Sequence, residues 1–265
     1  MKFLRLMYSV ATYIFFLGVF NYLVLFLGGG FLKEWLPFLS VLKTVDTGEA
    51  YFALPFLPAW LGNVVLLLVF SIHHSVMARS GVKKILTKFI PESAERSTFV
   101  LVTCVVLAWM FLAWQPQTAT VWRVDGVGRI SLALVFLMGS GLVLWSTFMI
   151  SHWRLFGVAQ AWDAFRGQEP PKDEFATPAL YQYSRHPMYV GVLIVLWATP
   201  HMTLSHLLLA CVWTGYVFIG IYFEERDLVR QFGAKYLAYQ ESVSKLVPFK
   251  LLARRRDLAQ KASTV

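Results

Sequence analysis

The chain has 265 residues, of which 57% are hydrophobic and 15% are charged, and its formal net charge is +9. Soluble domains carry about a quarter charged residues, so this composition excludes an ordinary soluble domain and predicts an integral membrane protein. The positive charge does not indicate nucleic-acid binding, because the basic residues flank the apolar runs, where they face lipid head groups and set orientation.

The N-terminal segment begins with basic residues and continues as an apolar run, Met7–Leu27. A signal peptide has a shorter apolar core that leads to a small-residue cleavage site, and no such pattern follows here. We therefore predict a retained first span, followed by an outer loop that packs along the membrane interface. The two cysteines, Cys104 and Cys211, lie inside later apolar runs, which indicates core packing and neither a disulfide framework nor a metal site.

Four more apolar blocks follow in chain order: Leu57–Ser71, Ser97–Trp114, Arg129–Ile150 and Tyr189–Phe223. The last block is too long for one ordinary span, yet it is shorter than the ~40 residues that two full crossings need. The sequence "ATPH" interrupts it. This block is therefore predicted to be either one long kinked helix or a hairpin that turns near Pro200.

The distribution of lysine and arginine favours the hairpin. With a cytoplasmic N-terminus and a hairpin at the end, twenty of these residues lie in cytoplasmic segments and four lie outside. A single crossing would place the basic C-terminal segment outside, against the positive-inside tendency. We predict an all-α polytopic protein with about five membrane helical blocks, both termini in the cytoplasm, and its polar motifs on the cytoplasmic face.

A donor-rich helix start is predicted at the sequence "YSRHPMYVG". Proline is favoured in the first helical turn, so Pro187 marks the start of a helix whose next N–H groups, at residues 188–190, point outward. Such a terminus binds anions such as a carboxylate. Arg185, His186 and Tyr189 add side-chain donors. Taken alone, this pattern also fits an interfacial turn with snorkelling side chains.

An acidic pair closes the predicted hairpin. Glu224 and Glu225 come at the end of a membrane helix, where the helix dipole disfavours anions, so they need a cationic partner. Pairing with Arg226, Arg230 or Arg185 would satisfy them. The functional interpretation is that a carboxylate receives the ammonium or ribose hydroxyls of a ligand whose own carboxylate lies on the helix start. The two ends would then frame an amino-acid zwitterion.

The combination of R-H-P-x-Y-x-G, an apolar hairpin, E-E-R and F-G-x-x-Y-x-x-Y resembles the membrane methyltransferases typified by isoprenylcysteine carboxyl methyltransferase and phospholipid methyltransferase. The resemblance covers roughly residues 140–250. It implies S-adenosylmethionine as the cofactor. By this analogy the cofactor site is formed by His186, Pro187, Tyr189 and Glu224, with Glu225 and Arg185 beside them, although Arg185 also suits the substrate side or the fold.

Two further stretches, "FSIHHSVMARSGVKKIL" with "PESAERSTFVL" and "LWSTFMISHWRLFGVAQAW", resemble bacterial methanethiol S-methyltransferases, which make dimethyl sulfide. This resemblance implies a small thiol as the substrate and a bacterial inner-membrane location. It extends the similarity to most of the chain beyond about residue 55. It places His74, Ser75, Arg79, Glu95 and Arg96 in the first stretch, and His152, Phe156 and Gln160 in the second.

These residues predict the chemistry of methyl transfer to a thiolate. Either His74 or His152 is expected to accept the thiol proton, and Arg79 and Arg96 to favour the anion. Ser75 and Phe156 are assigned to the substrate pocket and Gln160 to the cofactor. Each has a structural alternative as a helix-end, surface or interfacial residue. A histidine metal site is not expected, because adjacent histidines face different sides of a helix.

Two other functions compete with this prediction. One is methylation of a lipidic acceptor, either a prenylcysteine carboxylate or a phospholipid amine. The other is a membrane accessory or transport protein, which is disfavoured because the predicted spans show no polar conduit.

We treat residues 1–265 as a single membrane domain: 1–56 (first span and outer loop), 57–128 (second and third spans with the substrate-side motif), 129–250 (methyltransferase core with the cofactor pocket) and 251–265 (basic tail). The sequence predicts no oligomeric state.

Overall fold

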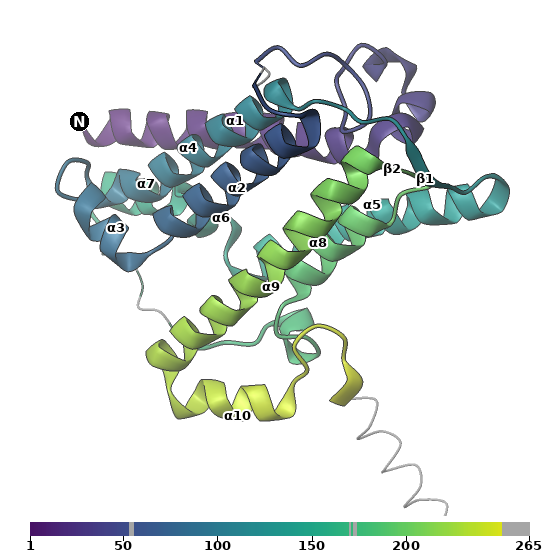
Figure 1. Cartoon of the computed structure of the whole chain (residues 1–265). Coiled ribbons are helices and arrows are strands. Elements are labelled where there is room, and N and C mark those ends of the chain that lie inside the picture. Colours follow the sequence, from purple (N-terminus) through teal and green to yellow (C-terminus); the bar gives the residue numbers. More distant parts are fainter. Residues whose placement is uncertain (53–55, 170, 172–173, 251–265) are drawn as a thin grey trace, which may run out of the picture.

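In the computed structural model, which describes residues 1–52, 56–169, 171 and 174–250, long helices dominate. Five described helices are long and apolar enough to cross a bilayer: α1 (Lys2–Trp35), α2 (Ala59–Met77), α4 (Glu92–Ala113), α5 (Gly126–Ile150) and α9 (Leu204–Phe232) (Figure 1). Helices form here because each apolar segment must satisfy its own backbone hydrogen bonds in lipid. The predicted all-α polytopic membrane protein is confirmed. The basic tail 251–265 lies outside the described residues.

The last apolar block is a hairpin of two helices. A short helix, α8 (Pro187–Trp197), is followed by strand β2 (His201–Thr203) and then by α9. Strand β2 pairs antiparallel with β1 (Thr120–Arg123), and the indole of Trp122 donates to the Thr199 carbonyl at 3.1 Å. The sequence analysis did not predict this two-stranded sheet, which attaches the tip of the hairpin to the segment before α5.

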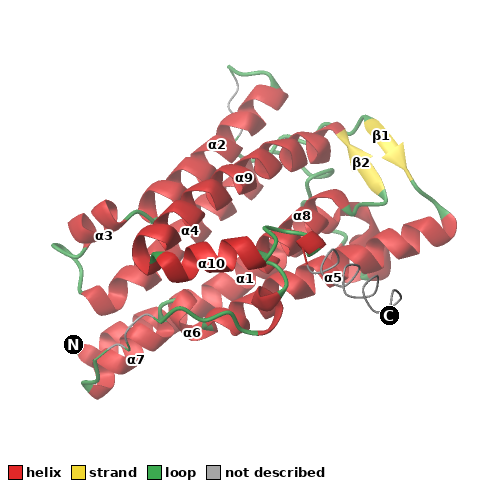
Figure 2. Cartoon of the chain, turned by 90° about the horizontal axis from the view of Figure 1, so that it is seen from below, coloured by secondary structure: helices red, strands yellow, loops and turns green. Residues whose placement is uncertain are grey.

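The shorter elements divide between the two ends of the bundle. We name one end the motif end (Figures 1 and 2). It holds the first residues of α1 and the whole of five short elements: α3 (Ser80–Leu86), α6 (His152–Leu155), α7 (Val158–Arg166), the 3-10 helix η2 (Ala179–Gln182) and α10 (Ala234–Ser242). The other, the strand end, holds β1, β2 and residues 36–52, which include the 3-10 helix η1 (Pro37–Leu39). All the predicted site residues lie toward the motif end.

The predicted outer loop differs from the structure in two ways. Helix α1 continues through residues 28–35, and it kinks at Gly29, where φ is +54°. A Cβ on Gly29 would lie 2.6 Å from the Asp46 carboxylate, so the close approach of the following segment requires glycine here. The Val45 N–H donates to the Phe26 carbonyl at 2.9 Å, and residues 43–46 are buried. This segment therefore packs against the helices instead of lying along the interface.

Gly157 fixes the contact between the motif end and α4. Its φ is +90°, and a Cβ there would lie 2.4 Å from Ser97 Oγ and 2.6 Å from the Ser97 backbone nitrogen. We expect Gly157→Ala to lower the free energy of unfolding by about 1–3 kcal/mol, because both the backbone conformation and the packing resist a side chain. Thermal unfolding in detergent measures this. Gly141→Ala, at an α5 position with open space around it, is the matched control, and equal melting temperatures for the two variants would contradict the prediction.

Candidate functional site

The start of α8 and the acidic pair near the end of α9 meet at the motif end. The Arg185 guanidinium donates to Glu225 Oε1 at 2.7 Å, and His186 Nε2 lies 3.2 Å from the same oxygen. The Arg185 and His186 side chains are 8% and 2% exposed. Lys245 Nζ adds a longer contact, 3.6 Å from Glu225 Oε2. Glu225 is therefore neutralised by the fold itself.

Arg185 also binds the segment that follows α9. Its Nη1 donates to the carbonyls of Gln240 at 3.0 Å and Val243 at 2.6 Å, at the end of α10. The guanidinium thus joins the start of α8, the end of α9 and the end of α10. Its contacts match the structural alternative considered from the sequence, in which Arg185 serves the fold.

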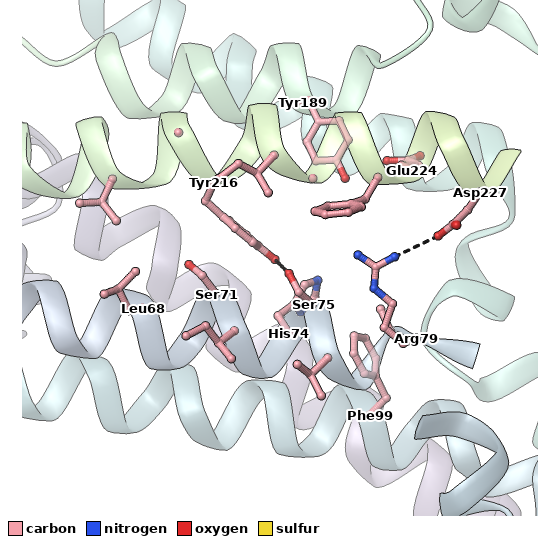
Figure 3. A pocket seen from close by; sticks show the side chains of 18 of the residues that line it. Leu68, Ser71, His74, Ser75, Arg79, Phe99, Tyr189, Tyr216, Glu224 and Asp227 are labelled. Atoms are coloured by element: carbon pink, nitrogen blue, oxygen red, sulfur yellow. Dashed lines mark hydrogen bonds and ion pairs between the residues drawn. The ribbon is translucent and has the colours of Figure 1, made fainter. Parts of the chain in front are cut away.

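Glu224, the other member of the acidic pair, faces a different environment. Its side chain is 44% exposed, and its carboxylate lies 3.9 Å from His186 Nδ1. It lines a large cavity together with Tyr189 of α8 (Figure 3). The two adjacent glutamates therefore differ: Glu225 is held in a buried ion-pair cluster, and Glu224 presents its carboxylate to the cavity.

The predicted donors at the start of α8 are only partly available. Pro187 occupies the first helical turn, as expected from the sequence. The Val190 N–H, however, already donates to the His186 carbonyl at 3.1 Å. The expectation that this N–H points outward is therefore wrong, because the helix hydrogen-bond pattern begins one residue earlier than assumed.

The cavity has a volume of about 860 Å³ and lies between α2 and α9. It is lined by residues of both predicted halves of the site. Those with polar or aromatic side chains include His74, Ser75, Arg79, Arg96, Phe99, Tyr189, Tyr216, Glu224 and Asp227. The sequence motifs of α2 and α4 therefore face the hairpin motif across one shared space (Figure 3).

His74 lies against aromatic rings at the cavity wall. Its imidazole stacks on Phe70 with ring centroids 5.7 Å apart, and Phe99 lies 5.1 Å away. Its Nδ1 is buried without a hydrogen-bond partner in the described part of the chain. An imidazole held in this way is a candidate for proton transfer, because nothing described on the protein competes for that nitrogen.

Two arginines line the cavity. Arg96 donates through Nε to the Leu155 carbonyl at 2.7 Å, and its guanidinium lies 4.8 Å from the Phe99 ring centroid. Arg79 pairs with Asp227 at 3.2 Å and lies over the Phe223 ring. The Arg79–Asp227 pair is about half exposed, so it contributes little to stability, but it connects the turn between α2 and α3 to α9 at the cavity.

His152 is not among the residues that line the cavity. Its Nε2 lies 2.7 Å from the Tyr13 hydroxyl and its Nδ1 lies 2.6 Å from the Thr147 hydroxyl. Burial lowers the pKa of His152, which favours the neutral imidazole. With both nitrogens engaged, this side chain holds α1, α5 and α6 together. Of the two histidines predicted as alternatives, the structure therefore places only His74 at the cavity.

Phe156 and Gln160 also lie outside the set that lines the cavity. Phe156 stacks on Phe16 of α1 with ring centroids 3.9 Å apart. Gln160 donates through Nε2 to the Arg154 carbonyl at 2.9 Å, and its Oε1 is buried without a partner in the described residues. Both side chains pack at the junction of α1, α6 and α7.

Tyr216 and Asp227 line the cavity but were not predicted. Both lie on the face of α9 that carries Glu224, at helical spacings of eight and three residues. That periodicity was the available signal. In the sequence alone, Tyr216 looks like a core aromatic residue in an apolar run, and Asp227 looks like one of many charged residues in a basic segment.

Within residues 1–52, 56–169, 171 and 174–250, no group of three or more His, Cys, Asp or Glu residues is arranged to hold a metal ion.

Comparison with known proteins gives consistent findings. A family model described as phospholipid methyltransferase matches residues 129–235. A methanethiol S-methyltransferase of a Pseudomonas species is 43% identical over 93% of this chain and 91% of its own length. The enzyme of that name from Mycobacterium tuberculosis is 40% identical over 94% of this chain and 97% of its length, and that from Pseudomonas deceptionensis is 46% identical over 79% of each. No solved structure matches the chain.

Proposed function

The chain belongs to the methanethiol S-methyltransferase family, and from this membership we propose that it methylates methanethiol to dimethyl sulfide with S-adenosylmethionine as the methyl donor. It is a methyltransferase of the membrane. The observation that carries the proposal is the shared cavity, where Tyr189 and Glu224 of the hairpin face His74 and two arginines of the other half.

The residues at the cavity fit S-adenosylmethionine. This donor has an amino-acid zwitterion, a ribose and a cationic sulfur, so its site needs an exposed carboxylate and nearby hydrogen-bonding groups. Glu224 is such a carboxylate, because its partial exposure leaves it available, whereas Glu225 is already neutralised. Tyr189 adds a hydroxyl beside it. A Cβ on Gly220 would lie 3.7 Å from that hydroxyl, in ordinary van der Waals contact, so the Tyr189 hydroxyl lies close to the α9 backbone. When bound, the donor supplies a methyl group attached to a sulfonium sulfur, and this sulfur leaves as a neutral thioether.

The protein must deliver the acceptor as a thiolate. Even a cysteine thiol has a pKa of about 8.5, so few methanethiol molecules are ionised at neutral pH. We assign His74 as the base that takes the thiol proton, and Arg79 and Arg96 as the cations that favour the thiolate. Ser75 lies in the same wall of the cavity. Holding the thiolate in line with the methyl group lowers the barrier further, because orientation alone is worth about 7–11 kcal/mol in aligned systems.

The decisive experiment uses purified protein in detergent with methyl-labelled S-adenosylmethionine. Three acceptors are compared: methanethiol, a prenylcysteine mimic and a phospholipid. We expect labelled dimethyl sulfide in the headspace above the methanethiol sample only. Label in the prenylcysteine or phospholipid fraction, with none in the headspace, would overturn the assignment.

A lipidic acceptor is the second candidate, and one observation favours it. Several residues that line the cavity are also exposed on the outer surface of the helix bundle. Among them, Ile72 and Ile219 are 60% and 58% exposed. A cavity that opens sideways toward lipid can admit a lipid tail. The acceptor panel above decides between the two candidates.

We further propose that the motif end faces the cytoplasm across a bacterial inner membrane, with both termini on that side. Twenty of the lysines and arginines then lie in cytoplasmic segments, in line with the positive-inside tendency. Single-cysteine labelling tests this orientation. A cysteine at exposed position 241 should react with a membrane-impermeant reagent only after the membrane is opened, and labelling of intact cells would contradict it.

A further inference from the structure

The cavity is much larger than methanethiol requires. One water molecule occupies about 30 Å³ in the liquid, and methanethiol has only two heavy atoms, so it fills a small fraction of about 860 Å³. A bound methyl donor accounts for the part near Tyr189 and Glu224. The remainder is a separate feature of the site that needs its own explanation.

A hydrogen bond across the cavity marks where this second part begins. Ser75 Oγ donates to Tyr216 Oη at 3.3 Å, and Figure 3 shows the tyrosine reaching from α9 to α2. Arg79, Glu224 and Asp227 lie on one side of this bridge. Leu68 and Ser71, which lie earlier in α2, are on the other side (Figure 3). We name that part the apolar arm, lined by Leu68, Ser71, Ile72, Cys211, Val212 and Gly215.

The apolar arm suits a hydrocarbon chain. Its single hydroxyl, on Ser71, is already used, because it donates to the Leu67 carbonyl at 2.7 Å. The arm runs along α2 from residue 68 to residue 75, which is about 10 Å at the helical rise of 1.5 Å per residue. A fully extended hexyl chain is shorter than that.

The arm is also accessible from the bilayer. Leu68 and Ile72 line it and are 45% and 60% exposed in the bundle, within the span α2. In a membrane these surfaces contact acyl chains, where apolar thiols accumulate because transfer of each methylene out of water is favourable. A thiol dissolved in the bilayer therefore meets the arm directly.

We propose that the apolar arm binds the alkyl chain of thiols longer than methanethiol, and that the protein also S-methylates linear alkanethiols up to hexanethiol. The inference rests on the proposed function. The thiol proton goes to the base, a carbon–sulfur bond forms between the alkanethiolate and the methyl group, and the methyl–sulfonium bond of the donor breaks. The products are an alkyl methyl sulfide and S-adenosylhomocysteine.

The test fills the arm without touching the reacting groups. Gly215 lines the arm, and a Cβ there has no heavy atom within 4 Å, so Gly215→Leu places its side chain in empty space. We expect kcat/KM for hexanethiol to fall at least roughly tenfold and that for methanethiol to change less than about threefold, since only the longer chain needs the arm. Gly141→Leu, the same substitution at an open position of α5 outside the cavity, should leave both values unchanged.

The possible outcomes distinguish failure of this inference from failure of the proposed function. If the unaltered protein methylates methanethiol but not butanethiol or hexanethiol, the arm is not a substrate subsite and the inference is wrong, while the proposed function stands. If no thiol is methylated, the proposed function fails and the inference fails with it. Val212→Phe fills the arm from the preceding turn, so it replaces Gly215→Leu if that variant does not fold. Full hexanethiol turnover in a folded arm-filled variant would also overturn the inference.

Discussion

Replacing His74 with alanine is expected to lower kcat for methanethiol by roughly a hundredfold or more, with the affinity for the methyl donor changed less than about threefold. In the described part of the chain, His74 is the only histidine that lines the cavity, and its Nδ1 has no hydrogen-bond partner there. Loss of a base removes the thiolate but leaves Glu224 and Tyr189 in place. Turnover is measured at saturating donor, and donor affinity by calorimetry without thiol.

The pH dependence of the His74→Ala variant gives a second readout. Without a base, the rate depends on thiolate already present in solution, so kcat/KM should rise about tenfold per pH unit below the thiol pKa. A merely structural histidine would not produce this slope. The matched control is His73→Ala, because His73 is adjacent in sequence but does not line the cavity. Near-normal turnover of folded His74→Ala protein would remove this residue as the base.

The substitution Glu225→Gln is expected to lower the free energy of unfolding by about 3 kcal/mol. The amide keeps the shape of the side chain but leaves the Arg185 guanidinium, 8% exposed, without its counter-charge. Breaking one side of a buried ion pair costs more than the pair itself contributes, because the remaining charge stays buried. Because Arg185 also holds the carbonyls of Gln240 and Val243, α10 should become protease-sensitive first.

Denaturant titration and limited proteolysis in detergent measure these two effects. Glu241→Gln is the matched control, since it makes the same chemical change at an exposed position of α10. It should alter stability by less than about 0.5 kcal/mol. If Glu225→Gln unfolds at the same denaturant concentration as the control, the cluster around Arg185 does not stabilise this end of the protein.

Much of the fold could be predicted because membrane segments carry strong local signals. Apolar length located the five blocks, and basic flanks chose a hairpin for the last of them. Pro187 fixed the start of α8. The predicted helix end at Glu224 and Glu225 was wrong, because α9 continues to Phe232, but the cationic partners expected for this acidic pair are present. These arguments needed only neighbouring residues, and the structure places the partners within ion-pair distance.

What could not be predicted depends on the direction of the chain between helices. His152 and His74 looked equivalent in sequence, and only their three-dimensional contacts distinguish them: His152 meets Tyr13 of α1, whereas His74 lines the cavity. Strands β1 and β2 are too short to show a periodic pattern. The kink at Gly29 was not predicted, because the residue that packs against this position, Asp46, belongs to the following segment. Tyr216 looked like any aromatic in an apolar run until its hydroxyl met Ser75.

The reach of Arg185 to residues 240 and 243 makes the start of α8 depend on a segment beyond the membrane helices. Every candidate span in the described residues precedes these two carbonyls in the chain. A chain truncated at the end of α9 would therefore keep all of these spans and the Glu225 partner of Arg185, but the buried guanidinium would lose two of its acceptors.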